Sequence, residues 1–396
     1  MDLSSAVDTE SASHPSVTIL EDLLRIQSVN PHYEKDARGE RDVADYIEER
    51  MRKAGLQVTR QPVVDGRDNI IAELRVGKPE SALLFEAHMD TVSIGSMENA
   101  LKPIYREGRL YGRGACDTKG ALAGMIHMME RCAQHPELLN ADLIFCASVD
   151  EEYVFRGLIN FMSLDIPLSG AVVGEPTELG IVVEHKGCAR FTVQAHGKSA
   201  HSSVPHKGEN AVYAMMDVVR YIRERVEPEL ATVKSELCGK PTIVVSTISG
   251  GSQINIVPEA CEISVDRRIV PGESPEQVLS EFERDIRTDL SEMRLTIEPL
   301  LLDPALNTPH DAAVVRSAQQ VAEMLGMNSS LRGVTYGSNA SKLQAWKGIP
   351  SIVYGPGSIE QAHSAEEWVP VDEVVQAAEF YYQLACSYKG NKEERG

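Results

Sequence analysis

Five short segments of this sequence place histidine or carboxylate side chains directly after apolar, strand-like chain. Because the carboxyl ends of parallel strands meet at one edge of a sheet, where α/β proteins build their binding sites, we expect these side chains to converge. Imidazole nitrogens and carboxylate oxygens together suit Zn²⁺ or another borderline divalent ion. The candidate residues are His88, Asp90, Asp117, Glu151, Glu152, Glu175 and His363.

Residues 150–152 are three consecutive carboxylates at the end of an apolar run. Like charges repel one another and resist burial, so this cluster costs free energy unless positive charge lies beside it. A pair of metal ions would supply that charge, and one glutamate could bind metal while its neighbour handles a proton.

Each motif alone has an ordinary explanation. His88 and Asp90 could be a satisfied pair in the core, and the paired glutamates could be a solvated helix start. Residues 111–120 resemble a phosphate loop, but Asp117 in their middle would repel phosphate. The coincidence of five such motifs favours the metal site. Outside these motifs, we predict that Glu366 and Glu367 are surface charges.

The elements that must position these residues alternate between apolar strands and amphipathic helices, which predicts an α/β domain with a mostly parallel sheet covered by helices. Strand patterns lie at 69–76, 82–90, 141–149, 170–176 and 350–357. Helical patterns lie at 41–55, 121–135 and 311–326.

Between residues 187 and 299 the pattern changes to alternating strands with two helices, at 209–227 and 274–290. This predicts an inserted α+β (ferredoxin-like) domain with an open antiparallel sheet. We therefore expect residues 1–186 and 300–396 to form one discontinuous domain that carries the metal site.

The length and composition limit the classes of protein to which this chain can belong. A chain of 396 residues exceeds what one core usually needs, so two domains are expected. The net charge of −20 argues against a nucleic-acid or membrane partner, because both need a basic surface. The seven cysteines show no C-x-x-C spacing and are predicted to be reduced thiols. The acidic N-terminal stretch has no apolar core and no long apolar run exists, so we predict no secretory signal, no membrane span and a cytoplasmic location.

Taken together, the motifs resemble the di-zinc amidohydrolase and peptidase family of acetylornithine deacetylase, succinyl-diaminopimelate desuccinylase, aminoacylase and carboxypeptidase G. The resemblance covers roughly residues 20 to 385, and two of the motifs lean towards the acetylornithine deacetylase branch. In chain order the motifs are HMDTV, YGRGACDTKG, DEE, GEPT, GKSAHSSVPHKGENA, GGSQINIVPEACEISVDRR and GPGSIEQAHSAEEWV.

This resemblance implies a role for each candidate in the catalytic domain. Asp117 would bridge two Zn²⁺ ions, which Co²⁺ could replace. His88 and Glu175 would hold one ion, and Glu152 and His363 the other. Asp90 would hydrogen-bond His88 and fix its tautomer. Glu151 would be the general base.

The resemblance also implies roles for the inserted segment, which would be a lid and the dimerisation domain of a homodimer. His201 would reach the neighbouring subunit's active site. Asn255 and Arg268 would contact the substrate, with the planar guanidinium of Arg268 at a substrate carboxylate. One position departs from the pattern: Asn339 stands where relatives commonly have aspartate, which leaves the substrate class open.

Three functions compete at this point. The first is hydrolysis of N-acyl amino acids by a metal-activated water, with Glu151 as base. The second is a di-zinc dipeptidase or carboxypeptidase with the same core. The third is a catalytically inactive metal-binding protein, which the complete set of ligand positions and the intact base disfavour.

Overall fold

The computed structural model describes residue 11 and residues 13–390, so most of the N-terminal stretch behind the prediction of no secretory signal lies outside the described residues. The chain divides into two compact units. Unit 1 runs to Val183 and includes Thr308–Arg332 and the chain from Ser338 onwards, whereas unit 2 comprises Glu184–Asn307 and Gly333–Gly337. The sequence patterns predicted the inserted segment at residues 187–299.

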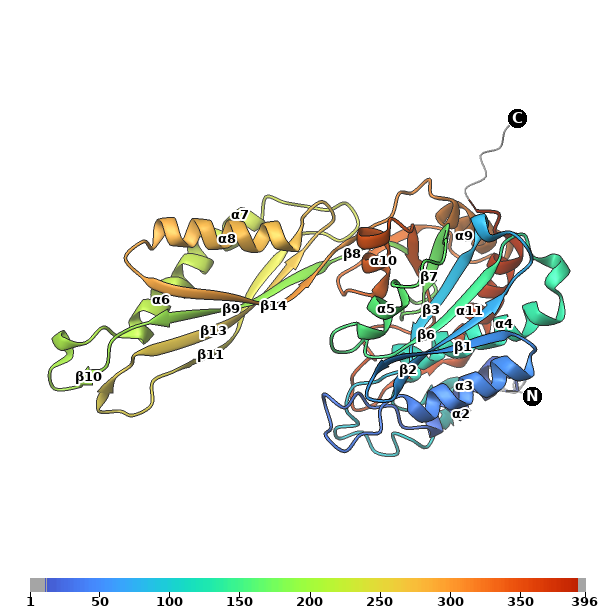
Figure 1. The fold of residues 1–396 in the computed structure, drawn as a ribbon, viewed down its shortest axis with the longest axis horizontal. Coiled ribbons are helices and arrows are strands. Elements are labelled where there is room, and N and C mark those ends of the chain that lie inside the picture. Colours follow the sequence, from blue (N-terminus) through green and yellow to red (C-terminus); the bar gives the residue numbers. More distant parts are fainter. Residues whose placement is uncertain (1–10, 12, 391–396) are drawn as a thin grey trace. The chain divides into compact units, whose positions relative to one another are not determined.

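Unit 1 is built on a large mixed sheet with the strand order β1-β2-β6-β3-β7-β17-β8-β15, and β16 pairs with β8 (Figure 1). The division between the units falls within β8 and β16, and β15 belongs to unit 2. The strands are β1 (Gln57–Val64), β2 (Arg67–Leu74), β3 (Leu83–His88), β6 (Leu143–Ser148), β7 (Gly170–Val173), β8 (Ile181–His185), β15 (Leu306–Asn307), β16 (Leu331–Val334) and β17 (Ser351–Val353).

The α/β class is confirmed, and the sheet is parallel only at its centre. Strands β6, β3, β7 and β17 run parallel to one another, whereas β1, β2 and β8 pair antiparallel at the two sides. The central strands β3, β6 and β7 are buried along their whole length. Strands covered on both faces read as continuous apolar runs, which is why the sequence displays these three most clearly.

Seven helices and a small three-stranded sheet complete the described part of unit 1. Helix α4 packs against α11 and α2, and α10 packs against β17 and β7. The helices are α2 (Pro15–Arg25), α3 (Arg41–Lys53), α4 (Gly120–Gln134), α5 (Arg156–Phe161), α9 (Ala313–Met324), α10 (Asn339–Lys347) and α11 (Val371–Ser387). The small sheet contains β4 (Ile104–Arg106), β5 (Arg109–Tyr111) and β18 (Trp368–Pro370).

Unit 2 contains a four-stranded antiparallel sheet with the order β11-β13-β9-β14, and α6 and α8 lie over one of its faces (Figure 1). The strands are β9 (Gly187–His196), β11 (Thr242–Gly250), β13 (Ala260–Ile269) and β14 (Arg294–Asp303), with a short ribbon of β10 (Ala200–His201) and β12 (Ile256–Val257). The helices are α6 (Ala211–Tyr221), α7 (Glu227–Leu230) and α8 (Pro275–Asp289).

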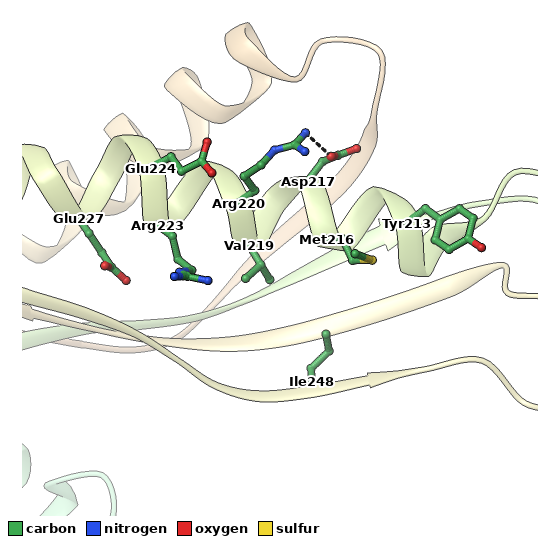
Figure 2. A pocket seen from close by; sticks show the side chains of 9 residues that line it. All are labelled: Tyr213, Met216, Asp217, Val219, Arg220, Arg223, Glu224, Glu227 and Ile248. Atoms are coloured by element: carbon green, nitrogen blue, oxygen red, sulfur yellow. Dashed lines mark hydrogen bonds and ion pairs between the residues drawn. The ribbon is translucent and has the colours of Figure 1, made fainter.

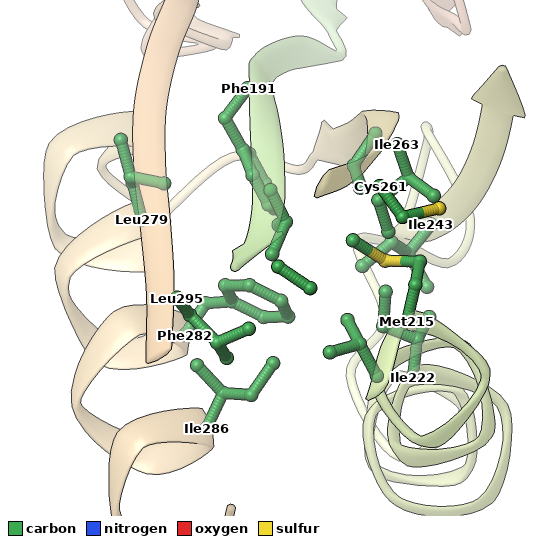
Figure 3. Packing of buried hydrophobic residues seen from close by; sticks show 14 of the residues in the cluster. Phe191, Met215, Ile222, Ile243, Cys261, Ile263, Leu279, Phe282, Ile286 and Leu295 are labelled. Carbon is green, nitrogen blue, oxygen red and sulfur yellow. The ribbon is translucent and has the colours of Figure 1, made fainter. Parts of the chain in front are cut away.

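The sheet of unit 2 buries one face against its helices, as the alternating sequence pattern predicts. Phe191 of β9 lies in the core, and its ring centroid is 4.9 Å from that of Phe282 on α8 (Figure 3). Met215 of α6 joins the same cluster. Helix α8 begins where Ser274 accepts a hydrogen bond from the Gln277 backbone N–H, a common helix cap. The opposite face of β9 and β13 is half-buried and polar.

All seven cysteines are free thiols, as predicted. Among the described residues, no helix is both long enough and apolar enough to cross a membrane.

Candidate active site

The candidate metal ligands lie in unit 1, at the carboxyl ends of its parallel strands. Strand β3 ends at His88, Glu151 and Glu152 follow β6, Glu175 follows β7, and the loop after β17 carries His363. Asp117 is the exception to the predicted pattern. It lies in the turn directly before α4, after a strand of the small sheet instead of the central one.

The side chains of these residues are brought together as the sequence predicts. The two oxygens of Asp117 face different histidines: Oδ1 lies 3.0 Å from His88 Nε2, and Oδ2 lies 3.2 Å from His363 Nε2. Glu152 Oε1 lies 3.1 Å from His363 Nε2, and Glu175 Oε1 lies 3.9 Å from His88 Nε2. The donors therefore form two groups that share Asp117.

Most of this cluster is buried, and its carboxylates outnumber its histidines. Burial and the nearby carboxylate of Glu152 raise the pKa of Glu151 to about 8, against the opposing effect of His88. Burial and Asp117 raise the pKa of Glu152 to about 7. Burial raises the pKa of Glu175 as well. Because burial is the main cause of these shifts, ionised carboxylates are costly in this cluster unless positive charge lies beside them, and divalent cations would supply that charge.

The donor set fits metal ions in composition as well as in charge. One ligand atom each from His88, Glu151 and Glu175 lies within 4.8 Å of the others, and so do atoms from His88, Asp117 and Glu152. Imidazole nitrogen with carboxylate oxygen is a set that Zn²⁺ and similar ions prefer. Glu151 belongs to one of these groups, so geometry alone admits it as a ligand as well as a base.

Asp90 supports the cluster through both its backbone and its side chain. Its backbone carbonyl lies 2.9 Å from His88 Nδ1, closer than its carboxylate at 3.6 Å. The carboxylate accepts hydrogen bonds of 3.1 Å from the backbone N–H groups of both Glu151 and Glu152. A backbone carbonyl on Nδ1 leaves Nε2 of His88 for a metal. The Asp90 side chain also holds the glutamate pair in place.

Asp150, the first of the three consecutive carboxylates, points to arginines and not to the metal cluster. Its carboxylate accepts hydrogen bonds from Arg156 Nε at 2.6 Å and from Arg67 Nη2 at 3.1 Å. Its backbone has a φ of 65°, a left-handed conformation that aspartate tolerates better than most residues other than glycine. Gly157 allows the following chain to pack close, because a Cβ there would lie 2.3 Å from the Val149 carbonyl.

Glu367 was predicted to be a surface charge, and that prediction is wrong. Its side chain is buried and accepts hydrogen bonds from the backbone N–H groups of Gly114, Cys116 and Asp117 at 3.0–3.1 Å. Arg113 Nη1 donates to the same carboxylate at 2.6 Å. Glu367 therefore fixes the turn that presents Asp117. Only its position before an aromatic strand residue could have suggested this burial.

Asn339, the position that departs from the family pattern, is the first residue of α10. Its side chain is buried and donates to Glu86 Oε1 at 2.9 Å. Burial raises the pKa of Glu86, which also accepts a hydrogen bond from Ser148. A neutral amide beside this buried carboxyl adds no second negative charge, whereas an aspartate would add one.

The remaining predicted residues belong to unit 2. His201 in β10 is exposed and pairs with Ile256 of β12, and the N–H of Ser202 donates to the Asn255 carbonyl at 3.0 Å. Unit 2 therefore brings His201 and Asn255 together at one ribbon. Arg268 lies near the C-terminal end of β13, and its Nε is 3.0 Å from the Asp266 carboxylate.

The chain matches a known protein family and individual relatives over most of its length. Residues 84–387 match the model of "Peptidase family M20/M25/M40". The chain is 30% identical to acetylornithine deacetylase of Myxococcus xanthus over 363 residues, covering 88% of this chain and 92% of that protein. It is 27% identical to a probable succinyl-diaminopimelate desuccinylase of Staphylococcus epidermidis, covering 94% and 97%.

The fold is shared with solved structures. Aminopeptidase PepT from Bacillus cereus superposes with a TM-score of 0.74 at 23% identity, covering 94% of this chain and 97% of that one. The matched segment includes every candidate ligand from His88 to His363. The chain therefore belongs to peptidase family M20/M25/M40 and is a metal-dependent amidohydrolase.

Proposed function

We propose that this enzyme hydrolyses the amide bond of N-acyl amino acids, in the manner of an acetylornithine deacetylase. The observation that carries the proposal is the paired arrangement around Asp117, with one histidine and one glutamate on each side. The relative named acetylornithine deacetylase, at 30% identity, supports the choice of substrate. The substrate would be a small molecule that carries a carboxylate beside the scissile amide.

The proposal assigns two Zn²⁺ ions to the cluster, with Co²⁺ as a possible substitute. His88, Asp117 and Glu175 would hold one, and Asp117, Glu152 and His363 the other. When bound, such ions polarise an amide carbonyl and lower the pKa of a water molecule towards neutrality.

Glu151 performs the proton transfers in this proposal. Its backbone N–H is held by Asp90, which fixes where its carboxylate can reach. Glu151 takes a proton from the attacking water and returns it to the leaving amine nitrogen. The attacking oxygen then ends in the released carboxylic acid, and the amine leaves neutral. His201 of a neighbouring subunit would donate a hydrogen bond to the oxygen that becomes negative at the carbonyl.

Metal removal and a substrate panel test this function together. A chelator should abolish hydrolysis, and added Zn²⁺ or Co²⁺ should restore it, because the buried carboxylates depend on the cation charge. Hydrolysis rates are then compared between N-acetylated amino acids and dipeptides. Faster dipeptide cleavage would assign a peptidase instead, and full activity in a demonstrably metal-free sample would overturn the proposal.

Arg268 is proposed to bind the substrate carboxylate. Arg268→Ala should lower kcat/KM about 10- to 100-fold for substrates with a free carboxylate, and much less for their amidated analogues. Arg190→Ala is the matched control, because Arg190 Nε also lies 3.0 Å from the Asp266 carboxylate. An equal loss on both substrate types would show that Arg268 only partners Asp266.

We also propose a homodimer formed through unit 2. Strand β11 is an edge of its sheet, and large apolar side chains are exposed beside it (Figure 2). Tyr213 and Met216 of α6 are 68% and 61% exposed, and Ile248 of β11 is 61% exposed. They line a hollow of about 730 Å³. Exposed apolar patches and unpaired strand edges are typical of surfaces that bind another chain, and a second copy gives closed two-fold symmetry.

A further inference from the structure

We propose that a hollow in unit 1, apart from the metal cluster, binds a small anion with a phosphate or carboxylate group. The hollow has a volume of about 540 Å³ and is lined by Arg38, Arg41, Arg67 and Arg156. Four arginines thus gather here in a chain in which acidic residues outnumber basic ones by 59 to 39. Asp65 is the one acidic residue in its lining.

The arginines come from separate elements and are held in different ways. Arg67 of β2 uses Nε and Nη2 on Glu40 and Asp150, and Arg156 at the start of α5 uses the same two atoms on Asp150. For both, no hydrogen bond of Nη1 is found in the described part of the chain. These carboxylates hold the two guanidinium planes in place, and the Nη1 N–H groups remain as donors for a bound anion.

Two further arginines complete the lining with less restraint. Arg38 pairs with Asp42 at 2.9 Å but keeps 68% of its side chain exposed. Arg41, in the first turn of α3, is exposed and makes no ion pair with any described residue. Planar guanidinium groups bind phosphate and carboxylate oxygens in pairs, so four around one small hollow favour a ligand with several anionic oxygens.

An aromatic pair gives the hollow a fixed wall. The rings of His32 and Tyr153 are stacked, with centroids 3.6 Å apart and planes 14° from parallel. Both residues line the hollow. Its volume lies within the range of ordinary small-molecule sites, which favours a metabolite-sized anion over a macromolecule.

The hollow is joined to the glutamate pair by hydrogen bonds. Asp150, which accepts from Arg67 and Arg156, directly precedes Glu151. Asn30 Nδ2 donates both to Asp150 at 3.0 Å and to Asp90 at 2.8 Å. Asp90 in turn holds the backbone of the glutamate pair. An anion that shares the arginines with Asp150 would therefore alter the loop that carries Glu151. This effect on turnover rests on the proposed function, whereas the binding does not.

Titration calorimetry of the metal-loaded protein tests the site, with inorganic phosphate and succinate as separate probes. Arg41→Ala should weaken binding of the preferred probe about tenfold, and Arg41→Glu should remove it. Arg52→Ala is the matched control, because Arg52 lies on the same helix but not in the hollow. Tighter phosphate binding would assign a phosphorylated ligand, and tighter succinate binding a carboxylate.

The outcomes that would overturn the site are distinct from failure of the proposed function. If neither phosphate nor succinate binds, the proposed anion site is overturned. Equal binding by wild type, Arg41→Ala and Arg41→Glu would also overturn it, because the anion would then lie elsewhere, as at the metals. Turnover by the wild type should change with the bound probe, and turnover by Arg41→Glu should not. A protein that binds the anion through Arg41 but hydrolyses no N-acyl amino acid would retain the site and lose only the proposed function.

Discussion

Glu151→Ala is expected to abolish hydrolysis and leave the metal content of the protein unchanged. A positioned general base contributes about 10²–10⁴ in rate, so kcat should fall by at least that range. The metals should remain, because Glu152, His363, Asp117, His88 and Glu175 still supply both donor groups. Glu151→Gln serves as the control for shape, since it keeps the side-chain volume and removes the base. Steady-state kinetics and elemental analysis of the same samples check both halves of this expectation.

Glu152→Ala should behave in the opposite way. Its Oε1 lies 3.1 Å from His363 Nε2, so its loss removes a donor from one group, and the metal content should drop. The contrast matters because Glu151 also offers a ligand atom within 4.8 Å of those of His88 and Glu175. If Glu151→Ala loses metal while Glu152→Ala keeps two ions, the two glutamates have exchanged roles.

The parallel centre of the sheet explains why much of the site could be predicted from the sequence. Strands β3, β6 and β7 are buried on both faces, so each appears as a mostly apolar run, interrupted only by Glu86 in β3, with polar residues at or just beyond its end. Neighbouring parallel strands end at the same edge, so the residues that follow them converge. His88, Glu152 and Glu175 were found in this way.

The supporting contacts could not be predicted in the same way, because they join residues far apart in the chain. Glu367 lies 250 residues beyond Asp117, from whose backbone N–H it accepts a hydrogen bond, and only the aromatic residue after it distinguishes its local sequence from that of the exposed Glu366. The positive charge beside Asp150 comes from Arg67 and Arg156, not from the metal cluster. Strand β1 was missed for a different reason: only Val58 of its eight residues is buried, so the strand carries little apolar signal.

The last expected result is complementation between two inactive variants. The resemblance to the family implies that His201 serves the active site of the neighbouring subunit, whereas Glu151 serves its own. His201→Ala should lower kcat about 10²–10³-fold, as loss of one donor to a developing oxyanion does. Glu151→Ala should be inactive for the reason given above.

In a mixed dimer, the His201→Ala subunit keeps its own Glu151 and receives an intact His201 from its partner. One of the two sites therefore works, and the other lacks both groups. Random pairing after joint unfolding and refolding makes about half of the dimers mixed, so roughly a quarter of wild-type activity should return. Differently tagged subunits and native mass measurement confirm that mixed dimers have formed.

Refolding each variant alone provides the control and should return no activity. If verified mixed dimers remain as inactive as the separate variants, His201 acts within its own chain, since each subunit would then lack one of the two groups that it needs. If His201→Ala is barely impaired from the start, His201 has no part in the chemistry. Its hydrogen bond to Ser203 Oγ, with the two atoms 2.7 Å apart, would then only shape the loop after β10.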